Sequence, residues 1–367
     1  MNMTKTSLGW SAALAGLAGL AVTVARRYGR MDAEARLRGK VVLITGGSRG
    51  LGYAIAQELA SKGARLVLTS RHLQELERAR TRLIAGGKIA PENVFIQASD
   101  VSVAAEIRSL VDAATAYFGQ IDVVVNNAGI ILVGPVESQV LANYQQAMDT
   151  NFSGALHTTL AVLPQMLARG DGAIVNIASI GGKVAFPHLL PYVASKFALT
   201  GWSQGLRAEI AGKGIRVTTV SPGIMRTGSH IQARFNGNAQ DEYRWFAGAA
   251  SFPGTATDAT AAARKVVSAL AKGTPEIAIG LQAMLAAHFS NLAPDLTAGM
   301  LSFANGFLPA SPDAGNPQFW GEDQSVAGKT YRGSLPQIVE RLGNKPIERY
   351  NQQPLTANEN QPAVTRV

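Results

Sequence analysis

The chain of 367 residues contains no cysteine and only five histidines. The absence of cysteine excludes disulfides, and without a closely spaced histidine cluster it argues against a zinc site. Acidic residues are scarcer than basic ones, 25 against 34, which gives a formal charge of +9. Such a balance favours an anionic partner, such as a membrane surface, a cofactor or a nucleic acid. The sequence has no basic stripe with interleaved aromatics, so nucleic-acid binding is not expected.

Charge is also missing from the start of the chain. Residues 6–25 are uncharged, with Lys5 before them and three arginines soon after. About twenty apolar residues match the thickness of a bilayer core, although the many alanines and glycines make insertion marginal. The segment could be a membrane anchor, a secretory signal cleaved after Ala25, or a hydrophobic helix lying on protein or membrane. We expect residues 1–30 to form a single-pass anchor, with the remainder of the chain in the cytoplasm because arginines follow the run.

A glycine-rich turn follows the first apolar strand. Residues 40–52 read KVVLITGGSRGLG, a helical pattern comes next, and a second strand, ARLVLTSR, comes after that. This order predicts the first βαβ unit of a doubly wound parallel sheet. Such a turn lets backbone N–H groups and a helix N-terminus approach a pyrophosphate. The cofactor-binding candidates here are Gly46, Ser48, Arg49, Gly50, Leu51 and Gly52.

The end of the second strand bears on the choice of cofactor. It reads Thr69-Ser70-Arg71 and carries no acid for a ribose 2′-hydroxyl. Arg71 and Arg49 could instead form charge-assisted bonds with a 2′-phosphate, unless they are simply solvated. We therefore expect NADP(H) to be preferred over NAD(H), with Arg71 and Arg49 as the candidates for its 2′-phosphate and Ser70 as a further cofactor contact.

Several further motifs follow the glycine turn in a fixed order. They are Asp100-Val101, Asn126-Asn127-Ala128-Gly129, Asn151, IVNIAS ending at Ser179, Tyr192 to Lys196, and Pro222-Gly223 with Thr227. With the turn TGGSRGLG, they resemble the short-chain dehydrogenase/reductase family, whose glycine pattern is TGxxxGxG, over residues 39–227. The resemblance implies an α/β, Rossmann-like doubly wound sheet in one domain, which we place at residues 38–280. It also implies a nicotinamide cofactor and hydride transfer between a carbonyl and an alcohol.

Tyr192 and Lys196 are four residues apart, which places both side chains on one helix face. A nearby ammonium lowers the pKa of a tyrosine, so Tyr192 is the predicted acid/base and Lys196 its activator. Ser179 ends an apolar strand and could polarise the same carbonyl oxygen. By resemblance, Lys196 also binds the nicotinamide ribose and Asn151 holds a water that links this lysine to solvent. The predicted catalytic set is thus Asn151, Ser179, Tyr192 and Lys196, and Tyr192 and Lys196 count among the cofactor contacts as well.

The remaining motifs supply the other predicted cofactor contacts. Asp100 is expected on the adenine side, the Asn126–Gly129 backbone along the site, and Thr227 near the nicotinamide carboxamide. Taken singly, these residues are ordinary turn formers. The set comprises Asp100, Val101, Asn127, Ala128, Gly129, Pro222, Gly223 and Thr227.

Outside the shared core the sequence is less informative. Residues 225–253 include the aromatics Phe235, Tyr243, Trp245 and Phe246 and could form a substrate lid or an ordinary packed helix. His188 could border the substrate pocket but is expected in a surface loop. Residues 281–309 form an apolar extension, predicted as two helices on a bilayer or over the pocket. Residues 310–367 are rich in Pro, Gly, Asn and Gln and are expected to be mostly loop or disordered tail.

These observations predict an NADP(H)-dependent oxidoreductase of a small-molecule carbonyl or alcohol. The anchor, the aromatic lid and the apolar extension favour a lipophilic substrate, although a polar sugar or a xenobiotic carbonyl is the alternative. A catalytically silent cofactor sensor or scaffold is a different class, against which the complete catalytic set argues. The resemblance further suggests a homodimer or homotetramer that pairs through the helices holding Asn151 and Lys196.

Overall fold

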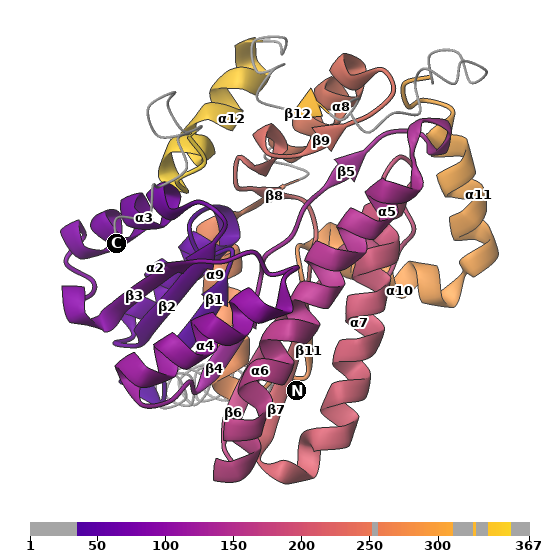
Figure 1. Cartoon of the computed structure of the whole chain (residues 1–367). Helices are drawn as coiled ribbons and strands as arrows, with labels where there is room; N and C mark the ends of the chain where they lie inside the picture. Colours follow the sequence, from indigo (N-terminus) through magenta and orange to yellow (C-terminus); the bar gives the residue numbers. More distant parts are fainter. Residues whose placement is uncertain (1–34, 252–255, 311–325, 328–336, 354–367) are drawn as a thin grey trace, which may run out of the picture.

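A computed structural model describes residues 35–251, 256–310, 326–327 and 337–353. Its centre is a seven-stranded parallel sheet in the order β11-β7-β6-β4-β1-β2-β3 (Figure 1). The strands are β1 Val41–Thr45, β2 Arg65–Ser70, β3 Val94–Ala98, β4 Val123–Asn126, β6 Gly172–Ile177, β7 Ile215–Pro222 and β11 Glu276–Ile279. The order reverses between β1 and β4, and ligands of such sheets bind at the carboxyl ends of the strands there. The predicted doubly wound α/β fold is confirmed.

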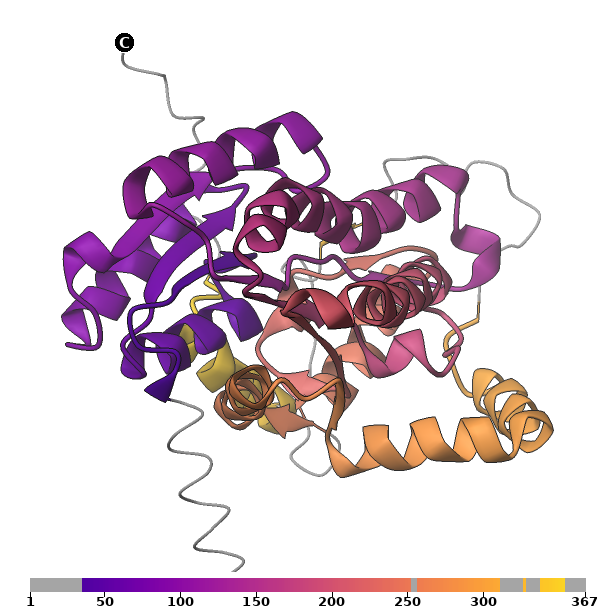
Figure 2. The same cartoon turned by 90° about the horizontal axis from the view of Figure 1, so that it is seen from below.

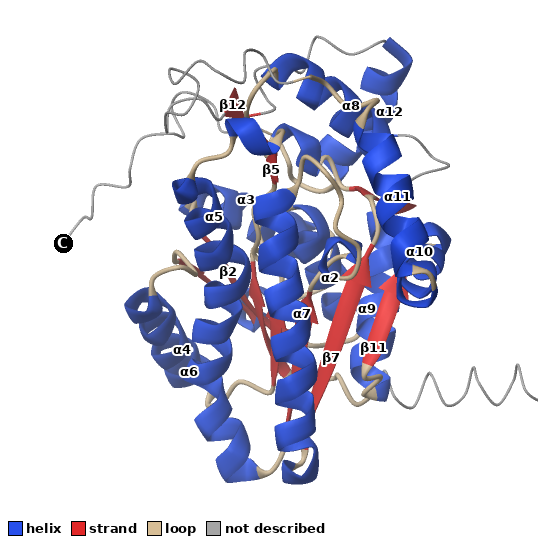
Figure 3. Ribbon diagram, turned by 90° about the vertical axis from the view of Figure 1, so that its right-hand side faces the viewer, coloured by secondary structure: helices blue, strands red, loops and turns tan. Residues whose placement is uncertain are grey.

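Helices cover both faces of this sheet (Figure 3). Because successive strand residues point to opposite faces, Val42 and Ile44 pack against one helix layer, whereas Val41 and Leu43 pack against the other. The first layer contains α2 Gly50–Ser61, α3 Leu73–Ala85 and α9 Ala259–Lys272, and the second contains α4 Ala104–Phe118, α6 Gly154–Arg169 and α7 Leu190–Ile210. The strands are therefore apolar on both sides, as burial in a three-layer fold requires.

Smaller elements stand over the carboxyl edge of the sheet. They are β5 Leu132–Val133, α5 Leu141–Met148, β8 Met225–Arg226, β9 Arg234–Phe235, α8 Ala239–Ser251, β10 Thr257–Asp258 and β12 Val326–Ala327. Phe235 and Tyr243 are fully buried here, and Trp245 and Phe246 are partly buried against them. These four aromatics thus form a small core of their own above the sheet.

The apolar extension folds as two helices, α10 Leu281–Leu292 and α11 Pro294–Asn305, which project from one side of the molecule (Figure 2). α11 has no buried residue, and Leu296, Met300 and Phe303 form an exposed stripe at helical spacing. Among the described helices none is both long and apolar enough to cross a bilayer. The anchor predicted at residues 1–30 lies outside the described residues.

The tail departs from the loop expected for it. Residues Gln337–Arg349 form helix α12, which lies beside α3 (Figure 1), where Arg82 donates to the Glu348 carbonyl at 2.8 Å. Tyr350, Asn351 and Gln352 are buried directly after the helix. A composition rich in Asn and Gln is compatible with this order because backbone groups and the Asn351 side-chain nitrogen find partners in the folded core.

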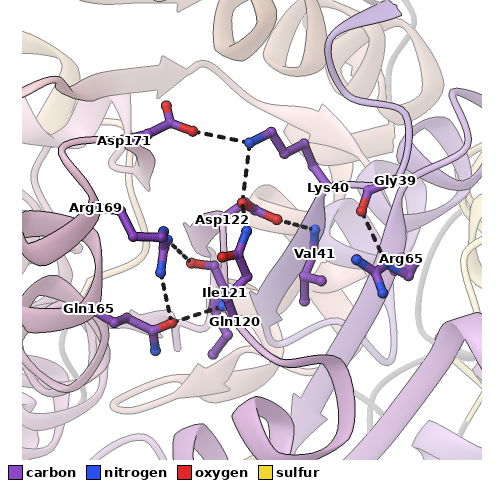
Figure 4. Close-up of polar contacts among 10 residues, drawn as sticks. All are labelled: Gly39, Lys40, Val41, Arg65, Gln120, Ile121, Asp122, Gln165, Arg169 and Asp171. Atoms are coloured by element: carbon purple, nitrogen blue, oxygen red, sulfur yellow. Dashed lines mark hydrogen bonds and ion pairs between the residues drawn. The ribbon is translucent and has the colours of Figure 1, made fainter.

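The opposite, amino-terminal edge of the sheet is closed by a polar network (Figure 4). Lys40 donates to Asp122 at 3.2 Å and to Asp171 at 3.0 Å, and the second oxygen of Asp122 accepts the Val41 amide at 2.8 Å. The hydrogen bond from Lys40 lowers the pKa of Asp171. This network joins β1 to the segments before β4 and β6 and stands at the far end of the strands from the motif residues.

Candidate active site

The glycine turn between β1 and α2 leaves no room for side chains. Gly46 has φ +63°, and a Cβ there would meet Ala128 and Asn127 at 3.0 Å. A Cβ on Gly52 would lie 2.2 Å from the Gly46 carbonyl oxygen. The turn therefore exposes backbone at the N-terminus of α2, where Leu51 lies in the first turn. This cradle fits the diphosphate of a dinucleotide.

Thr45, which the sequence reasoning did not include, ties the turn to the loop after β4. Its hydroxyl accepts the amides of Asn127 at 3.0 Å and Ala128 at 3.1 Å. The Asn127 side chain in turn donates to the carbonyls of Thr45 and Gly46 at 3.0 and 3.2 Å. Asn127 thus shapes the turn through its side chain, and the signal for Thr45 is a hydroxyl at a strand end directly before the glycines.

Ser48 and Arg49 both face a buried acid. Ser48 donates to Glu75 at 3.1 Å, and Arg49 forms an ion pair with the other oxygen of Glu75. Burial lowers the pKa of Arg49, an effect that Glu75 opposes and the charges of Arg71 and Arg78 add to. Arg49 is consequently neutralised within the fold, so Arg71 is the stronger candidate for a 2′-phosphate.

Positive charge gathers on this side of the site. Arg71 follows β2 and is exposed, whereas Arg234, on β9, is partly buried and donates to Gln146 at 3.0 Å. Burial lowers the pKa of Arg234, and the charge of Arg71 lowers it further. Two segments far apart in sequence thus bring like charges together, an arrangement that an anionic ligand would stabilise.

Ser179 and Tyr192 meet across a glycine. Ser179 lies two residues beyond β6, and its hydroxyl accepts the Gly181 amide at 3.0 Å. A Cβ on Gly181 would lie 3.2 Å from the Tyr192 ring and 3.4 Å from the Ser179 hydroxyl oxygen. Burial of the Tyr192 hydroxyl raises the pKa of this tyrosine, and a hydrogen bond with Ser179 acts in the opposite direction. Tyr192 is accordingly a protonated phenol at neutral pH, suited to donate.

The sequence predicts that Lys196 lowers the pKa of Tyr192, but in the structure the pKa of Tyr192 is raised by burial, and only the hydrogen bond with Ser179 opposes this. The Lys196 ammonium donates to the Ile177 carbonyl at 2.9 Å and lies 5.8 Å from the centre of the Tyr192 ring. Burial lowers the pKa of Lys196 to about 8. In this structure desolvation governs both residues, because Lys196 points to a backbone carbonyl and not to the phenol oxygen.

Asn151 lies at the junction of α5 and α6, in a π-helical turn, Asp149–Ser153. Its carboxamide accepts the Ile130 amide at 2.8 Å and donates to the Ile130 carbonyl at 3.1 Å and to Ser195 at 2.8 Å. A Cβ on Gly129 would lie 3.0 Å from the Asn151 oxygen and 3.6 Å from the Lys196 nitrogen. Asn151, Gly129 and Lys196 are therefore neighbours, and π-turns often mark functional sites.

The other predicted contacts stand at the same edge of the sheet with different partners. The Asp100 carboxylate accepts both the amide and the hydroxyl of Ser102 at 2.9 and 2.7 Å. Gly223, after β7, donates to the Ile279 carbonyl at 2.9 Å, and the Thr227 hydroxyl accepts the Ser229 amide at 3.1 Å. The remaining three are also near this edge: Ser70 and Pro222 end β2 and β7, and Val101 is buried beyond β3.

His188 is not a surface histidine, and that expectation is wrong. It is 6% exposed and bonds Glu242, itself fully buried, at 2.7 Å. Trp245 donates to the other oxygen of Glu242 at 2.6 Å. The pair joins the loop before α7 to α8. The burial of His188 is explained by the hydrogen-bond partner that α8 supplies.

One cavity of the described surface lies away from these residues. It measures about 500 Å³ and is open, between α9 and β11, with Arg264, Lys265 and Lys272 among its lining. It contains none of the motif residues. The candidate active site is therefore defined by the convergence of the glycine turn with Ser179, Tyr192 and Lys196.

Comparison with known proteins agrees with this geometry. The family model "short chain dehydrogenase" matches residues 40–236. A D-threitol dehydrogenase of Mycolicibacterium smegmatis is 40% identical over 197 residues, 54% of this chain and 74% of the relative. A "Dehydrogenase/reductase SDR family protein 7-like" of Drosophila melanogaster is 32% identical over 75% of this chain and 83% of its own. The crystal structure of a short-chain dehydrogenase from Streptomyces avermitilis superposes with a TM-score of 0.62 at 30% identity, covering 73% of this chain and 98% of that one.

The chain belongs to the short-chain dehydrogenase/reductase family. It is thus related to oxidoreductases that act on carbonyl or alcohol groups with a nicotinamide cofactor. The family match ends at residue 236, so α8 to α12 lie beyond it.

Proposed function

We propose that this protein is an NADP(H)-dependent oxidoreductase that interconverts a lipophilic carbonyl compound and its alcohol, with Tyr192 as the acid/base. The observation that carries the proposal is the convergence of Ser179 and Tyr192 across Gly181, next to the buried Lys196. When bound, the nicotinamide cofactor supplies or accepts the hydride. Tyr192 donates one proton to the carbonyl oxygen during reduction and regains it during oxidation, so hydride and proton balance.

Ser179 and Lys196 support this proton transfer. The Ser179 hydroxyl interacts with Tyr192 and lies where it can hydrogen-bond the same substrate oxygen. The Lys196 ammonium, held by the Ile177 carbonyl, adds positive charge behind the phenol as negative charge develops on it. Asn151 fixes the position of the Ile130 backbone through two hydrogen bonds and sits beside Lys196, so it keeps the lysine side of the site in place.

NADP(H) is the proposed cofactor because cations surround the end of β2. Arg71 and Arg78 act electrostatically on Arg49, and Arg71 acts on Arg234, whereas Glu75 compensates the charge of Arg49 through its pair with that residue. A 2′-phosphate brings the additional negative charge that this group favours.

The lipophilic substrate is supported by the walls next to Ser179 and Tyr192. On one side Ile180 and Val184 pack with Phe186 and with Ala283 of α10. On the other side Ile131 and Leu189 pack against the aromatics of α8. The polar groups there, His188 and Glu242, bond one another. A polar polyol or sugar is the second candidate, favoured by the 40% identity with a D-threitol dehydrogenase.

A membrane location extends the proposal. The uncharged run at residues 6–25 would anchor the chain, with the catalytic domain in the cytoplasm. The exposed apolar stripe of α11 stands beside α10, whose Ala283 packs close to the site. A bilayer that covers this stripe would place the pocket near dissolved lipophilic substrate.

Self-association is a further part of the proposal. Leu160 and Leu167 on α6 and Phe197 on α7 are exposed apolar side chains on the helices expected to pair. Burial of this face in a dimer or tetramer would remove them from water. Light scattering of purified protein in detergent, with Leu160→Glu as the disrupting variant, tests it.

The central experiment uses full-length protein in detergent with NADPH and NADH against lipophilic and polar carbonyls. We expect NADPH-dependent reduction of lipophilic carbonyls, and its absence from Tyr192→Phe, which should still bind NADPH. The control Tyr117→Phe, at an exposed tyrosine on α4, should leave turnover unchanged. Tight NADPH binding without turnover of any carbonyl would instead indicate a cofactor sensor, and activity confined to polyols would favour the second candidate.

A further inference from the structure

The segment that follows α12 packs on the glycine turn. The Gly50 amide donates to the Tyr350 carbonyl at 2.8 Å. Asn351, in the left-handed conformation at φ +56°, donates from its side chain to the Ser48 carbonyl at 2.8 Å. Residues 350–352 thus form a second layer over the turn that binds the diphosphate in this fold, although they lie more than a hundred residues beyond the family match.

Hydrogen bonds from several elements hold this segment in place. The Tyr350 hydroxyl bonds Asp258 at 3.1 Å and Thr260 at 2.9 Å, at the N-terminus of α9. Arg78 donates to the Gln353 carbonyl at 3.2 Å, and the Gln352 carbonyl accepts a hydrogen bond from Gln232 at 3.4 Å. These bonds come from α9, α3 and the segment before β9, which together surround the cofactor end of the sheet.

The side chain of Gln352 also approaches the turn. A Cβ built on Gly50 would lie 2.8 Å from the Gln352 side-chain nitrogen and 4.0 Å from the Thr227 Cβ. The Gln352 side chain therefore lies close to Gly50, on the side where Thr227 is also near. Gln352 is 3% exposed, and its side-chain oxygen is buried without a hydrogen-bond partner.

A buried carboxamide oxygen without a partner costs free energy unless a ligand satisfies it. A carboxamide offers two donors and one acceptor, which suit phosphate oxygens and a ribose hydroxyl respectively. The tail satisfies the Gly50 amide and Arg49 the Tyr53 amide, so the amides of Leu51 and Gly52 remain for an anion. A diphosphate next to a ribose combines both kinds of partner.

We propose that residues 350–352 form an additional wall of the dinucleotide site, in which the Gln352 carboxamide hydrogen-bonds the diphosphate and adjoining ribose of the cofactor. The inference rests on the proposed nicotinamide cofactor but not on the choice between NADPH and NADH, because both carry this diphosphate. Gln352 is accordingly a cofactor-binding residue contributed by the tail, outside the part of the chain that the family shares.

The test compares Gln352→Leu with the neighbouring control Gln353→Leu, whose contact with Arg78 uses a backbone carbonyl that leucine keeps. Affinities for NADPH and NADH are measured by fluorescence titration of the full-length protein. Gln352→Leu should weaken both cofactors by about the same factor, near tenfold, as expected for a lost hydrogen bond. Gln353→Leu should change neither by more than about twofold.

Stability without cofactor separates binding from folding. Because the Gln352 oxygen is unsatisfied, Gln352→Leu should leave the cofactor-free unfolding midpoint unchanged or raise it, whereas a structural role would lower it. Hydrogen exchange gives a readout independent of turnover, since NADPH should slow exchange at the Gly50 and Gln352 amides of the wild type. Gln352→Glu should weaken binding further, because its carboxylate would repel the diphosphate.

Three results would overturn the inference. Unchanged affinity in Gln352→Leu removes the contact, and tighter binding shows that the tail obstructs the cofactor. A loss confined to NADPH moves the contact to the 2′-phosphate. If the proposed preference for NADP(H) is wrong, the result is different. The wild type then binds NADH more tightly than NADPH, and Gln352→Leu still weakens the binding of NADH.

Discussion

His188 and Glu242 form a buried pair in which the imidazole nitrogen lies 2.7 Å from the carboxylate oxygen. The pair connects α8 to the segment directly before α7, the helix that holds Tyr192. Trp245 donates to the second carboxylate oxygen. The attachment of α8 to the segment before α7 therefore depends on this acid.

Replacement of Glu242 by glutamine exchanges one of its two acceptor oxygens for an amide donor, which leaves His188 or Trp245 without its acceptor. We expect Glu242→Gln to lower the free energy of unfolding by about 1–3 kcal/mol, the usual effect of an unsatisfied buried polar group. Denaturant unfolding measures this. The control Asp241→Asn breaks an exposed pair with Arg244 and should cost no more than about 1 kcal/mol. Equal losses of unfolding free energy in the two variants would show that the buried pair stabilises the fold no more than the exposed pair does.

The buried ammonium of Lys196 predicts a particular pH dependence of stability. Its pKa falls from 10.5 in the unfolded chain to about 8 in the fold. Between these values the unfolded chain binds more protons, so this residue destabilises the fold below pH 8 and does so less as the pH rises. Relative to Lys196→Met, the wild type should gain up to roughly 3 kcal/mol as the pH rises from 8 toward 10.5.

Urea unfolding of both proteins between pH 7 and 10 checks this prediction. The window stops at pH 10 because the raised pKa of Tyr192 makes that residue lower the stability at higher pH. A constant difference between the two proteins would mean that Lys196 is protonated throughout.

Cofactor choice should depend on Arg71. Arg71→Ala removes the charge proposed to face the 2′-phosphate, so NADPH affinity should fall about tenfold or more while NADH affinity stays within about twofold. Arg108→Ala, at an exposed arginine of α4, is the control. Equal loss of both cofactors would place Arg71 elsewhere on the dinucleotide, and titration with each cofactor distinguishes these cases.

Two alanine substitutions test the need for glycine in the turn: one lies in the turn and the other is a control in α7. Their expected effects are opposite. Gly52→Ala places a methyl group 2.2 Å from the Gly46 carbonyl oxygen, so the turn must open and dinucleotide binding should be lost. Gly201→Ala, in the interior of α7 with nothing within 4 Å, should instead stabilise the protein by about 0.5–1 kcal/mol. Thermal unfolding and cofactor titration measure both. Normal binding by Gly52→Ala would mean that the close approach is not needed.

The features that the sequence predicted are mainly local ones. The strand, glycine turn and helix at residues 40–61 follow from periodicity and from the need for bare backbone, and parallel strands bring Ser179 to the same edge as the turn. The side-chain partners were not predictable in this way. Glu75, for example, lies in a helix of ordinary amphipathic pattern, and only tertiary packing shows that it neutralises Arg49.

The same limit applies to the acid/base residues and to the tail. The four-residue spacing of Tyr192 and Lys196 correctly places them on α7, but burial sets their pKa directions, and burial depends on the whole fold. His188 gave no signal of its partner on α8. The order of residues 350–352 likewise depends on contacts with the start of the domain, which composition does not encode.

The contact between Asn351 and Ser48 joins residues 303 positions apart. During synthesis the glycine turn leaves the ribosome long before residues 350 and 351 exist, so among the described residues the bonds with Tyr350 and Asn351 are late additions to the turn. Contacts of such separation form late because the loop they close carries a large entropic cost. The glycine turn is therefore closed only after residues 350 and 351 have been made, and a chain cut short before residue 350 would contain the family core without this closure.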